Sequence, residues 1–180
     1  MTHFTIYYTE QKTESESFIR LAAADYTGKS CIRSEILREK HGKPYFSETD
    51  MPHFSLSHSG KFTICAVGPI PCGIDIQEHA FHGKPRDADY LIRLAERFFH
   101  PAEAERLKNA SDVKQSFFDR WAAKESCGKC TGDGVTGFSS FNTLDPANIF
   151  PRRITKIPLA EGYSTFLCAA EDFDYTTKRI

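Results

Sequence analysis

The fold follows from one β-rich stretch, which reads His53-Phe-Ser-Leu-Ser-His-Ser-Gly-Lys-Phe-Thr-Ile-Cys-Ala-Val-Gly-Pro-Ile-Pro-Cys-Gly-Ile-Asp-Ile-Gln77. In its first part, apolar Phe54 and Leu56 alternate with serines, which predicts a strand with one buried and one polar face. A Ser-Gly turn at 59–60 separates it from an apolar run at 62–67, and two prolines separate that run from a third strand at 73–77. Such short connections favour antiparallel neighbours.

The residues before this stretch predict a strand and a helix. Phe4 to Tyr8 is a short β-rich run, and the apolar residues from Glu14 to Tyr26 recur at the helical spacings of three and four. Gly28 follows as a helix stop. Ser34 to Arg38 fits either a strand or a helix, and the Gly-Lys-Pro triplet at 42–44 predicts a turn.

The residues after this stretch change to a helical pattern. Pro85 to Phe99 carries an apolar stripe, Pro101 suits the first position of a new helix, and Asp112 is a candidate N-cap for a helix that runs to about Cys130. Glycines at 132–137 end the helical character, and two β-like runs follow at 152–157 and 163–170. This order predicts an α+β fold, with an N-terminal half at 1–84 and a C-terminal half at 85–180 that pack as one compact unit.

The composition excludes several classes of protein. The 180 residues are 40% hydrophobic and 26% charged, which is typical of a globular chain and not of a disordered one. A net charge of −1 argues against binding nucleic acid through bulk charge. The longest apolar run has five residues, against the ~18 of a membrane span, and no basic segment of a signal peptide begins the chain. We expect a cytoplasmic protein that binds neither nucleic acid nor membrane, with six reduced cysteines.

Three groups of polar residues could carry chemistry. Asp75 and Gln77 are two apart on a predicted strand and point to the same side, where their oxygens would suit Mg²⁺. Glu125 and Lys129 lie four apart on a predicted helix, at the rim of its buried stripe. The Ser57 hydroxyl and the His58 imidazole, which lie beside a turn, can bind an anion. Each group also has an ordinary explanation: a strand with one wet face, a surface Glu–Lys pair, and a polar hairpin.

A Cys-Gly-Lys-Cys motif at 127–130 suggests zinc or thiol redox chemistry. Zinc would need further ligands, and the sequence contains no second paired spacing. A thioredoxin-type motif opens a helix after a strand, whereas Cys127 and Cys130 close one. The motif alone is therefore weak support for either chemistry.

Five motifs occur in a specific order along the chain. They are Gly42-Lys-Pro-Tyr-Phe46, His53-Phe-Ser-Leu-Ser-His-Ser-Gly60, Gly73-Ile-Asp-Ile-Gln77, Arg97-Phe-Phe-His-Pro-Ala-Glu103 and Trp121-Ala-Ala-Lys-Glu-Ser-Cys-Gly-Lys129. This series resembles the 4′-phosphopantetheinyl transferases of the surfactin-synthetase-activating type, over roughly residues 40 to 130. The Lys-Glu-Ser-x-x-Lys element downstream of Gly-Ile-Asp is a strong joint signal.

The resemblance implies a pseudo-dimer of two similar α+β halves, with coenzyme A in the cleft between them. Such enzymes transfer phosphopantetheine from coenzyme A to a serine of an acyl or peptidyl carrier protein and release adenosine 3′,5′-bisphosphate. The implied roles are Mg²⁺ binding by Asp75, Glu125 and Gln77, catalysis by Glu125 and Lys129, and coenzyme A binding by Lys43, Ser57, His58, Lys124 and Lys129. Trp121 would brace the helix that carries Glu125. We expect a monomer whose partners are coenzyme A and a carrier protein.

Two features depart from the family's pattern. Gln77 stands where the family commonly has a glutamate, so this neutral side chain would ligate a metal weakly or leave the place to water. No basic pair precedes the first helix to hold the 3′-phosphate of coenzyme A. Lys29, Arg33 and Arg38 are substitutes that the sequence does not place.

Two other classes of protein stay open. Gln77 favours a catalytically silent module that binds a carrier protein or coenzyme A, whereas Asp75, Glu125 and Lys129 argue against it. A zinc or thiol protein would instead be built on the cysteine pair at 127 and 130.

Overall fold

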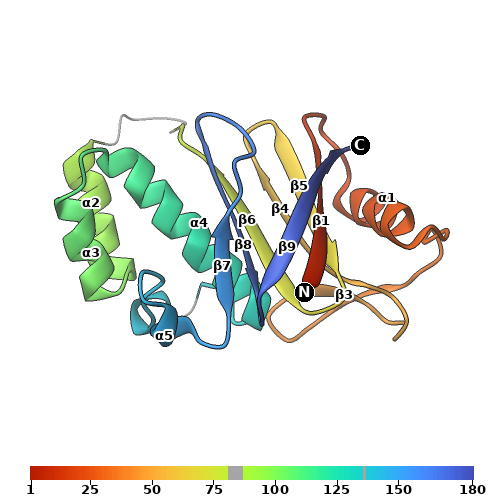
Figure 1. Ribbon diagram of the computed structural model, residues 1–180. Coiled ribbons are helices and arrows are strands. Elements are labelled where there is room, and N and C mark those ends of the chain that lie inside the picture. Colours follow the sequence, from red (N-terminus) through yellow and green to blue (C-terminus); the bar gives the residue numbers. More distant parts are fainter. Residues whose placement is uncertain (81–86, 136) are drawn as a thin grey trace.

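Two sheets form the centre of the molecule, with helices at both ends (Figure 1). This is a computed structural model of residues 1–180, of which 1–80, 87–135 and 137–180 are described. The first sheet has the order β4-β5-β1-β9, with β1 at Thr2–Thr9, β4 at His53–Ser59, β5 at Phe62–Gly68 and β9 at Phe173–Arg179. The second has the order β6-β8-β7, with β6 at Cys72–Glu78, β7 at Arg153–Lys156 and β8 at Tyr163–Ala169. The predicted α+β class is confirmed.

β4 and β5 form the predicted hairpin. Ser59 lies opposite Phe62 in their antiparallel register, so Gly60 and Lys61 make a two-residue turn. Gly60 has φ +55°, in the left-handed region that glycine adopts without strain. β5 is buried along its whole length between neighbouring strands and packed layers, which explains its continuous apolar run.

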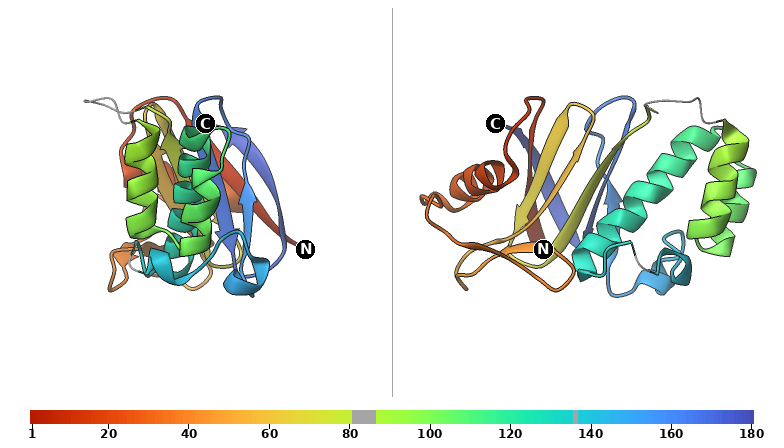
Figure 2. Two further views of the ribbon diagram at one scale, coloured as in Figure 1. Left: turned by 90° about the vertical axis from the view of Figure 1, so that its left-hand side faces the viewer. Right: turned by 180° about the vertical axis from the view of Figure 1, so that it is seen from behind.

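The sequence pattern does not predict β9. This strand pairs in parallel with β1, from Thr2 opposite Phe173 to Tyr8 opposite Arg179. The rings of Phe173 and Phe4 pack edge to face, with their centroids 5.5 Å apart. The strands at the two ends of the described chain therefore lie side by side in one sheet (Figures 1 and 2).

α4 (Val113–Thr131) lies across β6 and β8 and carries three of the predicted site residues, Lys124, Glu125 and Lys129 (Figure 1). It begins at the predicted N-cap, where the Asp112 carboxylate accepts a hydrogen bond from the Gln115 amide, and it ends before Gly132, which has φ +83°. Gly73 on β6 permits a close approach of this helix. A Cβ at that position would clash with backbone atoms of Ser126 and Cys130 and lie 2.9 Å from the carbonyl carbon of Lys129.

The outer elements follow most of the sequence signals. α1 (Ser15–Thr27) packs on the first sheet and ends as predicted at Gly28. The segment that fitted either a strand or a helix contains β2 (Ile36–Arg38), which pairs with β3 (Pro44–Phe46) across the predicted turn.

Helices α2 (Ala88–Phe98) and α3 (Pro101–Lys108) pack with α4 at the opposite end of the molecule (Figure 2). α3 begins with proline as predicted, and a capping box between His100 and Glu103 closes its N-terminus. The predicted start of α2 at Pro85 lies outside the described residues. The short helices η1 (Phe138–Ser140) and α5 (Pro146–Ile149) are not predicted by the sequence pattern.

Serines of β4 join the two sheets. β4 and β6 belong to different sheets, yet every second β4 side chain accepts a hydrogen bond from a β6 backbone amide. The pairs are Ser55 with Ile74 at 3.0 Å, Ser57 with Ile76 at 3.4 Å, and Ser59 with Glu78 at 2.9 Å. This row of bonds, which we call the serine seam, fixes the offset between the two strands and places Ser57 beside Asp75.

In each of the two sheets, a strand of the predicted N-terminal half pairs with a strand of the predicted C-terminal half. The boundary itself, at residues 84 and 85, lies outside the described residues. β6 precedes it and pairs with β8, which follows it, while β9 of the C-terminal half pairs with β1. The two halves thus share both sheets.

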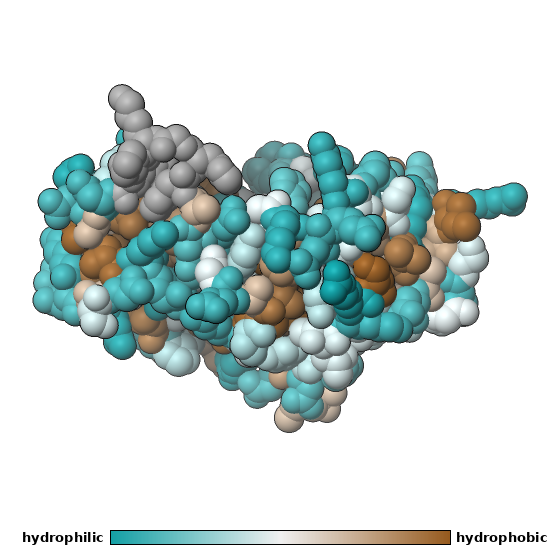
Figure 3. All heavy atoms as spheres, turned by 90° about the horizontal axis from the view of Figure 1, so that it is seen from above, coloured by the Kyte–Doolittle hydropathy of each residue, from teal (hydrophilic) through white to brown (hydrophobic). Residues whose placement is uncertain are grey.

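The described helices include none with the length and apolar character that a membrane crossing requires. Figure 3 shows one face of the molecule, on which hydrophobic side chains lie in separate areas among hydrophilic ones.

Candidate functional site

A pocket of about 370 Å³ opens beside the serine seam, and we call it the site pocket. Six of the predicted residues line it, namely Ser57, His58, Asp75, Gln77, Glu125 and Lys129. They come from β4, β6 and α4, which are distant along the chain. The fold therefore brings together the residues to which the resemblance gave roles in metal binding and catalysis.

Asp75 is the centre of the hydrogen bonding in the site pocket. Its side chain is 3% exposed. Oδ1 accepts hydrogen bonds from Lys129 Nζ at 2.7 Å and from Ser57 Oγ at 2.8 Å, and Oδ2 accepts one from Gln77 Nε2 at 2.8 Å. A buried carboxylate is stable only with such hydrogen-bond donors, and three neighbouring side chains supply them here.

Lys129 extends from α4 to the seam between the two sheets. Besides its ion pair with Asp75, its ammonium donates to Ser57 Oγ at 2.9 Å and to the carbonyl oxygen of Ile74 at 3.1 Å, and the carbonyl oxygen of Leu56 at 3.3 Å shares one of its three N–H groups. Its side chain is 28% exposed. The explanation of Lys129 as half of a surface Glu–Lys pair on one helix is therefore wrong, because its carboxylate partner lies on β6.

Glu125 lines the site pocket from the helix side. Burial raises the pKa of its carboxyl above the ordinary value, and the negative charge of Asp75 raises it further. Lys129 and a hydrogen bond with the Trp121 side chain act in the opposite direction. The Trp121 ring also stacks on Phe117, so this side chain contacts both Glu125 and the preceding turn of α4.

The donors in the site pocket fit Mg²⁺. Asp75 and Glu125 bring two carboxylates into one space, and their mutual repulsion is what a divalent cation would offset. Mg²⁺ prefers one or two protein carboxylates together with substrate phosphate oxygens and water. Within the described residues, no group of three or more His, Cys, Asp or Glu is arranged to hold a metal ion.

Gln77 is placed beside Asp75 and not across the pocket from it. Its amide nitrogen donates to Asp75, so this residue orients the carboxylate instead of adding a second one. The predicted pair on one face of β6 is confirmed as a geometric pair.

Lys43 lies in an adjoining cavity of about 210 Å³, which shares Pro44, Leu56 and Lys129 with the site pocket. Its Nζ donates to the carbonyl oxygen of Cys130 at 3.1 Å, at the end of α4. The two cavities together extend along the seam from the carboxylates toward the β2–β3 turn.

Two basic side chains other than Lys129 line the site pocket. His58 on β4 is exposed at its edge, and Arg38 on β2 lines it. Neither Lys29 nor Arg33 lines the pocket. Lys29, Arg33 and Arg38 were the candidates to replace the basic pair that would hold the 3′-phosphate of coenzyme A. Of these three residues, the structure brings Arg38 to the site pocket. The sequence alone gave no signal for this choice, because it depends on how β2 folds over the seam.

Lys124 is not in the site pocket. Its side chain is completely buried, and its ammonium pairs with Glu103 at 2.7 Å and donates to the carbonyl oxygens of Phe138 and Phe141, each at 2.6 Å. Its side chain points toward Glu103 on α3 and Phe138 on η1, whereas that of Glu125 lines the site pocket. We leave Lys124 out of the coenzyme A ligands, because its charge is already compensated inside the protein.

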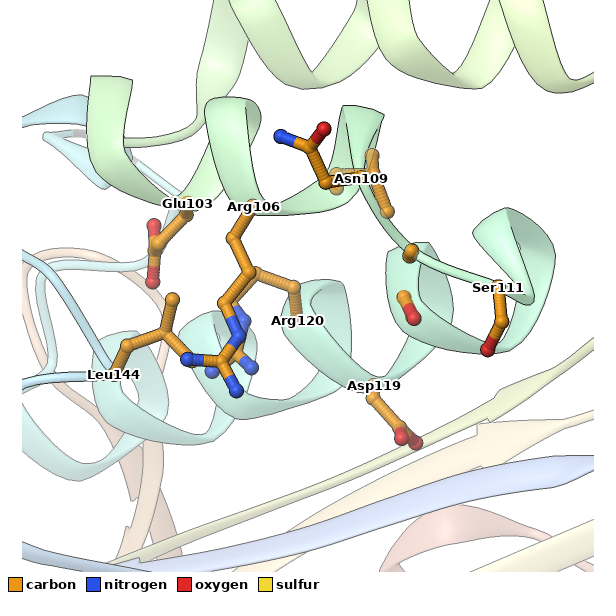
Figure 4. A pocket seen from close by; sticks show the side chains of 10 residues that line it. Glu103, Arg106, Asn109, Ser111, Asp119, Arg120 and Leu144 are labelled. Carbon is orange, nitrogen blue, oxygen red and sulfur yellow. The ribbon is translucent and has the colours of Figure 1, made fainter.

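Another cavity, of about 460 Å³, lies between α3 and α4 (Figure 4). Arg106 and Arg120 point into it, and its acidic residues Glu103 and Asp119 already pair with lysines at 2.7 Å. None of the residues predicted to bind metal or coenzyme A lines it. The site pocket is therefore the better candidate for the predicted chemistry.

Comparisons with known proteins point to one family. The family model described as the 4′-phosphopantetheinyl transferase superfamily matches residues 71–177, which include β6 and α4. A 4′-phosphopantetheinyl transferase of Bacillus subtilis is 35% identical over 123 residues, or 67% of this chain and 51% of that protein. The 4′-phosphopantetheinyl transferase psf-1 of Bacillus pumilus is 41% identical over 106 residues, or 57% of this chain and 42% of that protein.

A longer match is the 4′-phosphopantetheinyl transferase HetI of Nostoc sp., which is 32% identical over 176 residues, or 92% of this chain and 70% of that protein. The chain spans about half or less of the length of the two Bacillus relatives.

Proposed function

The chain belongs to the 4′-phosphopantetheinyl transferase superfamily, and from this premise we propose that it transfers 4′-phosphopantetheine from coenzyme A to a serine of an acyl or peptidyl carrier protein. The second product would be adenosine 3′,5′-bisphosphate. The observation that carries the proposal is the meeting of Asp75, Glu125 and Lys129 in one pocket, from a strand and a helix that are some 50 residues apart.

Asp75 and Glu125 would hold one Mg²⁺, which when bound would neutralise the pyrophosphate of coenzyme A and polarise its oxygens. Gln77 and Ser57 would keep the Asp75 carboxylate oriented toward the pocket, since each donates a hydrogen bond to it. Phosphoryl transfer depends on such positioning and charge neutralisation more than on covalent catalysis.

Glu125 is suited to accept the proton of the carrier serine. Its pKa is raised by burial and by Asp75, so it is a stronger base than an exposed glutamate. Lys129 is suited to neutralise negative charge at the reacting phosphorus, since its ammonium lies within the same pocket and stays partly exposed.

The rest of coenzyme A would lie along the serine seam. We place its phosphates near Ser57, His58 and Arg38, and its nucleotide near Lys43, because these groups line the site pocket and the adjoining cavity. The binding cleft would then lie between the two sheets. We further propose that the two similar halves of the chain form a pseudo-dimer, and that the protein acts as a monomer in the cytoplasm.

Intact mass spectrometry tests the proposal. The protein is incubated with coenzyme A, Mg²⁺ and apo forms of several acyl and peptidyl carrier proteins, with Asp75→Asn as the control. At least one carrier should gain the mass of one phosphopantetheine group with the wild-type protein and none with the variant. Bound coenzyme A without any carrier modification would overturn the proposal and favour the silent binding module that Gln77 suggests.

A further inference from the structure

Three cysteines meet behind the site pocket. Cys127 and Cys130 lie on α4, and Cys168 lies on β8, beneath the helix. The Cys127 thiol donates to Cys168 Sγ at 3.4 Å, and the Cys168 thiol in turn interacts with Cys130. The fold thus adds Cys168 to the two cysteines of the motif at 127–130. The proposed transfer reaction uses none of these three cysteines.

Cys130 is the most accessible of the three cysteines. It is 8% exposed, against 2% for Cys127 and none for Cys168. A hydrogen bond from Cys168 lowers the pKa of the Cys130 thiol, burial opposes this, and the positive charges of Lys43 and Arg152 lower it further. Within the described residues, the buried Nε of Arg152 has no hydrogen-bond partner, so its charge is not fully engaged elsewhere.

We propose that Cys130 and Cys168 form a peroxide-sensitive thiol pair, which links α4 to β8 by a disulfide when a hydroperoxide oxidises it. The Cys130 thiolate attacks one oxygen of hydrogen peroxide, whose O–O bond breaks to give a sulfenic acid and hydroxide, which takes a proton to become water. The Cys168 sulfur then attacks the Cys130 sulfur, the S–O bond breaks, and a second water leaves with the Cys168 proton. Two thiols lose two electrons in total, and the peroxide gains them.

The position of the pair connects it to the site pocket. Cys130 directly follows Lys129, and its carbonyl oxygen accepts the hydrogen bond of Lys43. Cys168 lies opposite Gly73 in the β6–β8 register, where the glycine permits a close approach of α4 to the sheet. Because the core is closely packed there, drawing α4 onto β8 must alter the spacing between Glu125 on the helix and Asp75 on β6.

Peptide mapping tests the disulfide without reference to the proposed transfer. The reduced protein is treated with hydrogen peroxide, free thiols are alkylated, and the protein is digested with trypsin without reduction. Cleavage after Lys129 separates Cys127 from Cys130, so the two possible links give different peptide pairs. We expect the peptide that begins at Cys130 joined to the one that contains Cys168. Full alkylation of both residues, or a link only through Cys127, would overturn the assignment.

Activity measurements test the consequence, which rests on the proposed function. Peroxide should lower the transfer rate of the wild-type protein by about tenfold or more, and dithiothreitol should restore it. Cys168→Ser should remain active under the same treatment, while Cys31→Ser, at a buried cysteine outside the cluster, should be as sensitive as the wild type. Thermal unfolding of each variant checks that it is folded. Equal losses in wild type and Cys168→Ser would overturn the link between the disulfide and activity.

Discussion

Replacing Gly73 by alanine should separate the two elements that carry the carboxylates. The added Cβ would clash with backbone atoms of Ser126 and Cys130 and lie 2.9 Å from a backbone carbon of Lys129, where ordinary contact begins at 3.4 Å. These are helix backbone atoms and cannot rotate away, so α4 must retreat by more than about 0.5 Å, the shortfall at the least crowded of the three contacts. Overpacking of this kind costs about 1–3 kcal/mol of stability, and a misplacement near 1 Å costs about 10²-fold in rate.

The control for this change is Gly162→Ala. Gly162 has φ +75° and open space around its Cβ position, so alanine there should cost about 1–2 kcal/mol through backbone strain alone. Urea unfolding measures stability, and carrier mass gain measures the transfer rate. The two variants should be similarly destabilised, but only Gly73→Ala should lose about 10²-fold in rate. Full activity in Gly73→Ala would show that the contact of α4 with β6 does not set the geometry of the site.

Three further substitutions probe individual site residues. Lys129→Met should lower kcat by about 10²-fold with a smaller effect on coenzyme A binding, and an equal loss in both would place the lysine in ground-state binding alone. In Glu125→Gln the raised pKa sets the sign: the charged carboxylate is disfavoured in the folded state, so the wild-type protein loses stability as pH rises through the folded-state pKa. The Glu125→Gln variant should therefore be inactive, yet more stable than the wild type at neutral pH by about 0.5–2 kcal/mol in chemical unfolding. This difference in stability should vanish in acid. A variant that is less stable than the wild type at neutral pH would contradict the argument that burial disfavours the charged carboxylate. Gln77→Glu should keep or raise Mg²⁺ affinity in calorimetry, because it adds a charged oxygen beside Asp75; a large loss would mean that the amide is needed to orient that carboxylate.

Local sequence signals predicted the central elements because those signals are strong there. The alternation in β4, the proline at the start of α3 and the Asp112 cap each act within a few residues. β9 was missed because it is a largely exposed edge strand, and its parallel partner β1 lies at the other end of the chain. No local pattern encodes such a pairing.

Site residues could be predicted from the sequence where a motif places them on one face of a helix or strand. Asp75, Glu125 and Lys129 fall in this class, and the structure brings them together. Lys124 shows the limit: it stands next to Glu125 in the motif, but adjacent helix positions point in different directions, and Glu103 on α3 supplies its partner. The serine seam could not be predicted either, because it depends on two sheets meeting edge to edge.

A double-mutant cycle on the transfer rate tests most directly whether Asp75 and Glu125 act as one site. The rate of carrier modification is measured for wild type, Asp75→Asn, Glu125→Gln and the double variant, at saturating coenzyme A and Mg²⁺. If both carboxylates serve the same metal and substrate, each single change should remove nearly all activity and the double variant should be no slower than the slower single variant. Losses that multiply, or a single variant that retains full activity, would contradict a shared site.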